Sequence, residues 1–226
     1  MNLLILGRGK TGSLVEEVAR SRRHHFQVLG GKENQDGCAL TPECLHDVDV
    51  VIDFTTPSAV PGNIAACLRE HKQMVVGTTG WHKEMPDLRN SVEKAGTGFL
   101  WAANFSIGIN IFLDVVRASS EAHRHGYFGQ IFERHHQHKK DAPSGTALVL
   151  QNIVQEKCGA ELEITSFREG DVVGMHELVF DSPNDRIYLC HDAKSRRGYA
   201  EGAVLGAEWL ATKKGFFEFK DIWREL

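Results

Sequence analysis

The chain has 226 residues, of which 42% are hydrophobic and 25% charged, and these values are typical of a soluble globular protein with one large or two small domains. A formal net charge of −4 argues against general binding of nucleic acid or of anionic membranes. No apolar run approaches the roughly 20 residues that a membrane span needs. The apolar start MNLLILGRGK is too short for a signal peptide, so we expect a cytoplasmic protein.

The first half of the chain alternates short apolar runs with helical patterns. Runs typical of buried parallel strands lie at residues 3–6, 26–29, 48–54, 74–76 and 99–102. Apolar residues at helical spacing follow the first run, over 10–23, and the third run, around 64–68. This alternation predicts βαβ units and a parallel sheet, that is, a Rossmann-type domain over residues 1–104.

The pattern changes near Asn104. The expected elements are a helix over roughly 107–123, a strand at 129–136, a helix from Pro143, and alternating segments at 161–167, 172–180 and 185–193. The turn SPND at 182–185 predicts an antiparallel hairpin between the last two segments. We therefore expect an α+β domain with an open mixed or antiparallel sheet over 105–202, and a final helix, 203–211, that returns to the first domain.

The five cysteines carry little functional information. They are scattered and odd in number, and no C-x-x-C occurs among Cys38, Cys44, Cys67, Cys158 and Cys190. The sequence therefore predicts reduced thiols rather than a disulfide framework or a zinc knuckle. A catalytic thiol is an alternative that no neighbouring activation pattern favours.

A glycine-rich fingerprint lies where the first strand meets the first helix. Gly7-Arg8-Gly9-Lys10-Thr11-Gly12 is a G-x-G-x-x-G motif, whose glycines allow a tight turn and a close approach of the backbone to a pyrophosphate. The motif alone is a weak signal, but its place between strand and helix makes dinucleotide binding the favoured interpretation. The alternative is a glycine-rich turn that binds no ligand.

The choice between the two nicotinamide cofactors rests on conflicting residues. Glu33 lies where an acid bonds the ribose hydroxyls of NAD. Lys32 beside it, with Arg8 and Lys10 in the fingerprint, supplies cations for the extra phosphate of NADP. We expect use of NADPH, with NADH as a further cofactor.

Two more strand ends are candidate ligand sites, because ligands of such sheets bind at the carboxyl ends of the strands. One is Asp53-Phe54-Thr55-Thr56-Pro57, and the other is Gly77-Thr78-Thr79-Gly80, which is small enough to lie under a nicotinamide ring. An ordinary helix cap or turn is the alternative for each.

Residues 133–147, ERHHQHKKDAPSGTA, concentrate titratable and cationic side chains before a helix start. If 133–138 continue a strand, His136 and His138 point one way and His135 the other. Gly145 and Thr146 then present backbone amides at a helix N-terminus, which is an anion site. A carboxylate-bearing substrate fits there, with His135 or Lys139 near enough to act as a general acid. A zinc site that includes Asp141 and a solvated basic loop are the alternatives.

This stretch contains every fixed position of E-x-H-H-x-x-K-x-D-x-P-S-G-T-A and resembles the signature of the 4-hydroxy-tetrahydrodipicolinate reductase (dihydrodipicolinate reductase) family. Four further segments resemble the same family: DVVIDFTTP at 49–57, VVGTTG at 75–80, AANFSIGIN at 102–110 and SRRGYAEGA at 195–203. The phosphate loop is one residue shorter than in many members. The resemblance covers essentially the whole chain.

The resemblance implies a mechanism and a set of site residues. Hydride passes from a nicotinamide cofactor to a cyclic dicarboxylate, with His135 as the proton donor and Lys139 as a second acid. His136, Gly145, Thr146 and Arg196 would bind the substrate. The cofactor positions would be Gly7, Arg8, Gly9, Lys10, Thr11, Gly12, Lys32, Glu33, Gly77, Thr78, Thr79, Ala102, Ala103, Asn104 and Phe105. No metal is implied.

The resemblance also implies a division of labour and an assembly. Residues 1–104, completed by 203–226, would bind the dinucleotide, and residues 105–202 would bind substrate and build a homotetramer. Three other functions stay open at this point: a related dehydrogenase of another small anion, a nucleotide-binding sensor without catalysis, and a zinc hydrolase.

Overall fold

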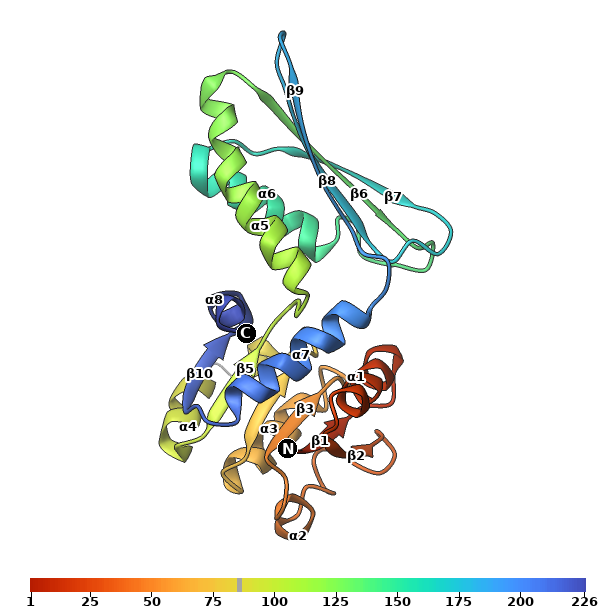
Figure 1. The fold of residues 1–226 in the computed structure, drawn as a ribbon, viewed down its shortest axis with the longest axis vertical. Coiled ribbons are helices and arrows are strands. Elements are labelled where there is room, and N and C mark those ends of the chain that lie inside the picture. The colour runs from red at the N-terminus through yellow and green to blue at the C-terminus, as the bar shows by residue number, and fades with distance from the viewer. Residues whose placement is uncertain (85–86) are drawn as a thin grey trace. The chain divides into compact units, whose positions relative to one another are not determined.

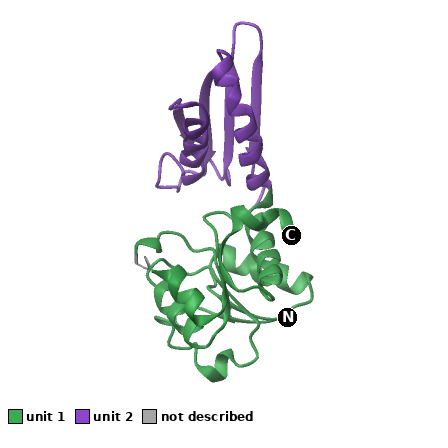
Figure 2. Cartoon of the chain, turned by 90° about the vertical axis from the view of Figure 1, so that its left-hand side faces the viewer, with its two compact units in different colours: residues 1–107, 197–226 green, residues 108–196 purple. Residues whose placement is uncertain are grey.

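The computed structural model describes residues 1–84 and 87–226. They form two compact units, which Figure 2 colours separately. Unit 1 contains Met1–Ile107 and Arg197–Leu226, and unit 2 contains Gly108–Arg196. No helix in the described part of the chain is both long enough and apolar enough to cross a membrane.

Unit 1 is built on a six-stranded sheet with the order β10-β5-β4-β3-β1-β2, and all its strand pairs are parallel (Figure 1). Its strands are β1 (Asn2–Leu6), β2 (His25–Leu29), β3 (Val50–Asp53), β4 (Gln73–Val76), β5 (Gly98–Trp101) and β10 (Gly215–Glu218). Its helices are α1 (Lys10–Ser21), α2 (Pro42–Leu45), α3 (Val60–Arg69), α4 (Leu88–Ala95), α7 (Arg197–Leu210) and α8 (Phe219–Ile222), with short 3₁₀ turns at His82–Glu84 and Trp223–Glu225.

Away from their end residues, the central strands of unit 1 are apolar because helices cover both faces of the sheet. Ile52 and its neighbours on one face pack with α1 and α7, whereas Val51 and its neighbours on the other face pack with α3 and α4. The predicted parallel α/β sheet is therefore confirmed.

Two features of unit 1 differ from the sequence-based expectation. The last long helix begins at Arg197 rather than at Ala203, so the stretch SRRGYAEGA lies mostly inside it. The chain then adds β10, a parallel strand beside β5 that the sequence did not predict. A four-residue strand carries too little periodicity to be recognised without its neighbour.

Unit 2 is a four-stranded mixed sheet with the order β7-β6-β8-β9. β6 pairs parallel with β7 and antiparallel with β8, which forms an antiparallel hairpin with β9. The elements are α5 (Ile107–Ser119), a 3₁₀ turn (Ser120–His125), β6 (Phe128–His135), α6 (Gly145–Cys158), β7 (Glu163–Arg168), β8 (Met175–Asp181) and β9 (Arg186–Asp192).

Helices α5 and α6 cover one face of this mixed sheet, where Ile131, Leu178 and Phe180 pack against Phe112 and Leu150. The predicted mixed sheet and the hairpin around residues 182–185 are confirmed.

Candidate active site

The glycine fingerprint forms a strand–turn–helix junction in unit 1. β1 ends at Leu6, Gly9 is the N-cap of α1, and Gly7 has a positive φ of 105°. A Cβ atom at Gly7 would lie 2.2 Å from the carbonyl oxygen of Phe54, and one at Gly12 would lie 2.1 Å from that of Gly7. A Cβ at Gly9 would have no neighbour within 4 Å. Two glycines thus allow close packing, while the third leaves the helix N-terminus open to an anion.

A pocket of about 360 Å³ lies in front of this turn. It is lined from the ends of three neighbouring strands, by Gly9, Lys10, Thr11, Phe54, Thr55, Pro57, Gly77, Thr78 and Thr79. The chain crosses from one side of the sheet to the other between β1 and β3, and ligands of such sheets bind at that point. The pocket therefore lies where a sheet of this kind binds its ligand.

Asp53 organises the floor of this pocket, a role that the sequence did not reveal. Its carboxylate is fully buried. Oδ1 accepts hydrogen bonds from the amide and hydroxyl of Thr55 and from the hydroxyl of Thr78, at 2.9, 2.7 and 3.0 Å. Oδ2 accepts from Asn63 at 2.7 Å. Burial raises the pKa of Asp53 above its ordinary value, although these donors oppose the shift.

The segment Ala102–Phe105 follows β5 at the same edge of the sheet but does not line the pocket around Gly9. The amide of Ala102 donates to Val76 at 3.2 Å, and the side chain of Asn104 accepts from the amide of Ser106 at 2.9 Å. The buried ring of Phe105 lies 6.3 Å from the ring of Phe54, centre to centre. Ala103 is exposed.

The residues predicted to choose the cofactor lie beyond β2. The carboxylate of Glu33 accepts a hydrogen bond from the amide of Gly30 at 2.6 Å, and Arg8 lies 3.3 Å away. The Gly30 amide and the Arg8 charge lower the pKa of Glu33. Lys32 is exposed beside them. Arg8 and Glu33 thus pair with each other, so their contacts do not show whether the site prefers NADH or NADPH.

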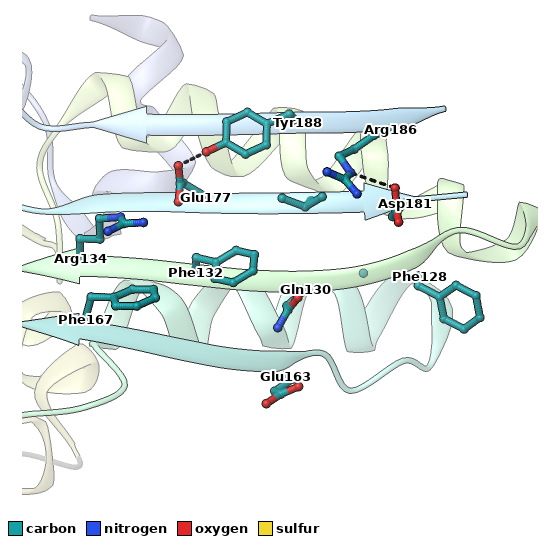
Figure 3. Close-up of a pocket in the computed structure, with 12 residues that line it drawn as sticks. Phe128, Gln130, Phe132, Arg134, Glu163, Phe167, Glu177, Asp181, Arg186 and Tyr188 are labelled. Carbon is teal, nitrogen blue, oxygen red and sulfur yellow. Dashed lines mark hydrogen bonds and ion pairs between the residues drawn. The ribbon is translucent and has the colours of Figure 1, made fainter. Parts of the chain in front are cut away.

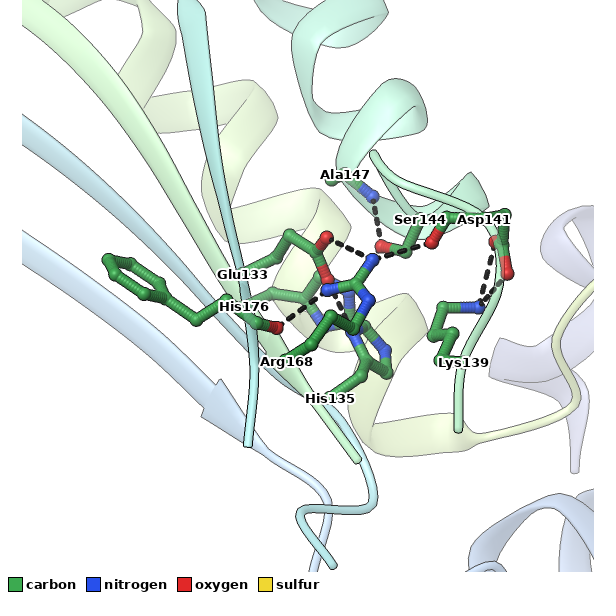
Figure 4. Close-up of polar contacts among 9 residues, drawn as sticks. Glu133, His135, Lys139, Asp141, Ser144, Ala147, Arg168 and His176 are labelled. Atoms are coloured by element: carbon green, nitrogen blue, oxygen red, sulfur yellow. Dashed lines mark hydrogen bonds and ion pairs between the residues drawn. The ribbon is translucent and has the colours of Figure 1, made fainter. Parts of the chain in front are cut away.

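The candidate acid site, called the acid site below, lies in unit 2 (Figure 4). Glu133 and His135 are two residues apart on β6, so their side chains share one face of the strand. His135 Nδ1 donates to Glu133 Oε2, and Arg168 on β7 lies 2.8 Å from Glu133 Oε1. Burial lowers the pKa of His135, while the charge of Glu133 opposes that shift. Burial alone would raise the pKa of Glu133, but hydrogen bonds from Arg168 and Ser166 hold it below its ordinary value.

A second histidine connects this site to helix α6. The ring of His176 on β8 lies 5.1 Å from that of His135 in an edge-to-face arrangement, and its Nε2 is 3.1 Å from Ser144 Oγ. Burial lowers the pKa of His176 to about 4, so the ring is neutral at pH 7. Ser144 is the N-cap of α6 and accepts from the amide of Ala147.

Gly145 and Thr146 occupy the first two helical positions, where backbone amides have no acceptor within the helix. The predicted helix N-terminus is therefore present beside the acid site. Lys139 lies near it, and its ammonium contacts both carboxylate oxygens of Asp141 at 2.8 Å.

The strand does not continue to His138 as the sequence suggested. β6 ends at His135, and a turn follows, in which the amide of Lys139 donates to the carbonyl of His136 at 3.0 Å. Only His135 belongs to the strand. The predicted alternation, which placed His136 and His138 on the opposite face of the same strand, is therefore wrong. Arg196 lies in a turn before α7, and within the described residues no hydrogen bond joins it to the His135 cluster.

Glu133, His135 and His176 have ligand atoms within 4.8 Å of one another, which is close enough to surround a metal ion. The carboxylate is already bound by the guanidinium of Arg168 and by the imidazole of His135. A metal would displace both partners and would lie beside a fixed positive charge. These contacts favour proton transfer over metal binding.

Three residues of the acid site were missed in the sequence. The sequence contained a signal for Glu133, because residues two apart on a strand share a face and Glu133 therefore lies on the same face as His135. Arg168 and His176 had none, since they reach the site only through pairing of β7 and β8 with β6.

A parallel sheet with a dinucleotide turn, joined in one chain to a mixed sheet that carries a buried histidine–carboxylate pair, is typical of a two-domain nicotinamide-dependent oxidoreductase. The family model described as "Dihydrodipicolinate reductase, N-terminus" matches residues 1–105, and the model described as "Dihydrodipicolinate reductase, C-terminus" matches residues 108–223. The chain therefore belongs to the dihydrodipicolinate reductase family, as the sequence predicted.

Similar proteins agree with this assignment. A 4-hydroxy-tetrahydrodipicolinate reductase from Christiangramia forsetii is 36% identical over 244 residues, which cover 100% of this chain and 99% of the relative. One from Laribacter hongkongensis is 34% identical, over 78% of this chain and 76% of the relative. The solved structure of dipicolinate-bound dihydrodipicolinate reductase from Paenisporosarcina sp. TG-14 has a TM-score of 0.79 at 22% identity, over 98% of this chain and 99% of that one.

Proposed function

We propose that this chain reduces 4-hydroxy-tetrahydrodipicolinate (dihydrodipicolinate) to tetrahydrodipicolinate, a step of diaminopimelate and lysine biosynthesis, in the cytoplasm and with NADPH and/or NADH. The observation that carries the proposal is a buried histidine, held by a carboxylate, beside the N-terminus of α6. A proton donor next to an anion site is what reduction of a cyclic dicarboxylate requires.

Unit 1 would bind the nucleotide. The open amides after Gly9 would receive the pyrophosphate, and Gly77, Thr78 and Thr79 would lie under the nicotinamide ring. Ala102, Ala103, Asn104 and Phe105 would border the ring from the neighbouring strand. The bound cofactor supplies a hydride. Thr78 and Thr55 are held in place by Asp53, so the pocket is arranged before the cofactor binds.

Unit 2 would bind the substrate. The amides of Gly145 and Thr146 would hold one carboxylate, with His136 and Arg196 as further contacts. The Lys139 ammonium, now paired with Asp141, would exchange that partner for a substrate carboxylate. His135 would deliver the proton, with Lys139 as second acid. Substrate carboxylates near His135 favour its protonated form.

Unit 2 would also carry the homotetramer interface. One face of its sheet is covered by helices, and the other forms an open hollow of about 560 Å³ with the aromatic rings of Phe132, Phe167 and Tyr188 (Figure 3). Phe128 at the end of this face is 79% exposed. A concentration of exposed aromatic side chains is typical of a protein interface.

Sedimentation tests the assembly. Phe128→Lys should shift the protein from tetramer to smaller species, because a charge would be buried at the interface. Leu226→Lys, which changes another exposed apolar side chain, should leave the tetramer intact. A wild-type monomer would contradict the proposal.

A coupled assay tests the activity. The preceding synthase generates the substrate in place, and oxidation of NADPH or of NADH is followed by absorbance. We expect rapid oxidation that depends on the synthase product. Cofactor binding without oxidation would contradict the proposal, as would faster oxidation with a different small anion.

A further inference from the structure

Glu133 is a buried carboxylate placed behind the proposed proton donor. Its side chain is fully buried, on the strand face that carries His135. A carboxylate in such a place is costly unless it is paired and hydrogen-bonded. Both oxygens are used here, because Oε2 accepts from His135 Nδ1 and Oε1 contacts Arg168.

Arg168 is fixed in turn by backbone carbonyls. Its guanidinium donates to the carbonyl oxygens of Phe167 and Asp141, at 2.6 and 2.5 Å. The guanidinium therefore cannot turn away from Glu133 without losing three contacts, and Glu133 cannot turn away from His135 (Figure 4). The three side chains form a chain that ends at the imidazole.

This chain decides which nitrogen of His135 exchanges a proton. A hydrogen bond from Nδ1 to a carboxylate keeps the proton of the neutral ring on Nδ1, so that protonation and release occur at Nε2. Nε2 lies against Gly174, where a Cβ atom would come within 3.0 Å of it. The glycine leaves the Nε2 side free of a side chain.

The charges around the ring oppose one another. The groups that face His135 are Glu133 on β6, Arg168 on β7, His176 on β8 and Lys139 in the turn after β6, where Lys139 is itself paired with Asp141. Glu133 favours the imidazolium, whereas Lys139 and Arg168 disfavour it. His176 is neutral at pH 7 and adds no charge.

We propose that Glu133 is a positioning residue for proton transfer, which orients His135 through Nδ1 and stabilises the imidazolium that gives up its Nε2 proton. The proposal rests on the proposed function. Loss of the substrate 4-hydroxyl as water would leave a conjugated ring, to which the cofactor hydride would bring two electrons and one hydrogen. The Nε2–H bond then breaks, its electrons remain on nitrogen, and the proton joins the neighbouring substrate carbon. The neutral imidazole takes a new proton from water before the next turnover.

The test is the pH profile of Glu133→Gln. Glutamine has the same shape, and with its amide oxygen toward Nδ1 it keeps the orientation of His135 while the charge is lost; its N–H₂ group then faces Arg168, which costs stability. Activity requires the imidazolium and therefore falls as pH rises through the pKa of His135. Without the charge, the midpoint of this fall should move by about one to two pH units to lower pH. At pH values above the wild-type midpoint, kcat of the variant should be about 10- to 100-fold lower than that of wild type. KM and the Kd for NADPH should stay within about twofold of wild type.

Two variants serve as controls. Glu133→Asp keeps the charge and should keep the wild-type midpoint with a reduced kcat. Glu169→Gln removes an exposed carboxylate that pairs with Arg134 and should leave kcat and its profile unchanged. A Glu133→Gln profile with the wild-type midpoint, at any kcat, would overturn the proposal.

An NMR titration of His135 separates this proposal from the proposed function. It needs no substrate, and the imidazole pKa should be lower in Glu133→Gln than in wild type. An unchanged imidazole pKa sinks the role of Glu133 even if the enzyme is active. A lowered pKa in a protein that never turns over the synthase product supports the pairing and rejects the activity.

Discussion

Unit 1 and unit 2 each hold a fully buried carboxylate under a polar site, Asp53 and Glu133, and the two are held by different partners. Asp53 accepts from two hydroxyls, one amide N–H and one carboxamide, all of them neutral. Glu133 is held by a guanidinium and by a titratable imidazole. Neutral donors fix loops without exchanging protons, which suits a binding site. Charged and titratable partners set the protonation of a neighbour, which suits acid catalysis.

The largest expected effect comes from removing the acid. His135→Gln should lower kcat by about 10²–10⁴-fold, the usual contribution of general acid catalysis. The Kd for NADPH should change little, because the nucleotide pocket is lined by unit 1 residues. Single-turnover kinetics and cofactor titration measure the two quantities. Unchanged turnover in His135→Gln would contradict the assignment of acid catalysis to unit 2.

Lys139→Ala should reduce both kcat and substrate affinity, because one ammonium would act as acid and as carboxylate ligand. Loss of a charge-assisted contact predicts a fall in kcat/KM of about 10- to 100-fold. Lys140→Ala, at the exposed neighbouring position, should behave as wild type. Equal losses in the two variants would indicate a general effect of the basic turn.

His176 should make stability depend on pH. Its folded-state pKa is depressed to about 4 by burial, so its contribution is present above the unfolded-state pKa of about 6.5 and is lost as pH falls toward 4. The full loss is on the order of 3 kcal/mol. Urea unfolding of wild type and His176→Gln over this range measures it, and the variant should have the smaller pH dependence.

His46→Gln is the control for this series, because the His46 side chain is 80% exposed. It should retain the wild-type pH dependence. A His176→Gln protein with the same pH dependence as wild type would show that His176 is not held neutral by burial.

Asp53→Asn tests the other half of the comparison. An asparagine here directs an N–H₂ group at a neighbouring donor, and a buried unsatisfied group costs about 1–3 kcal/mol. We expect lower thermal stability and about tenfold weaker NADPH binding. The pH midpoint of kcat should not move, since Thr55, Asn63 and Thr78, which donate to Asp53, do not titrate in this range. A shift of the pH midpoint of kcat in Asp53→Asn would contradict the assignment of proton-transfer control to Glu133 alone.

The smallest effect is expected at Glu33. Glu33→Gln removes an acid from the cofactor edge and frees Arg8 for a phosphate. The preference for NADPH over NADH, as the ratio of kcat/KM values, should rise by about two- to fivefold, as expected for an exposed pair. Glu43→Gln, an exposed position on α2, should leave the ratio unchanged. A fall in the ratio would contradict the role of Arg8.

The sequence by itself determined the features whose signals are local. Apolar runs such as 3–6 predict strands buried on both faces, and Ser144-Gly145-Thr146 predicts a capped helix start. Period two on a strand also places Glu133 and His135 on one face, although the role of Glu133 was missed. The family signature, also a local run, predicted the proposed acid and the proposed anion site.

Tertiary structure decided the features that depend on residues far apart in the chain. Arg168 and His176 reach Glu133 and His135 because β7 and β8 pair with β6 in a particular register. Asp53 at the end of β3 accepts a hydrogen bond from Thr78, which follows the neighbouring strand β4. The short strand β10 forms because it pairs with the edge of β5. Strand register fixes which distant side chains meet, and no local periodicity encodes it. The residues proposed to carry the chemistry were therefore visible in the sequence, and most of those that hold them in place were not.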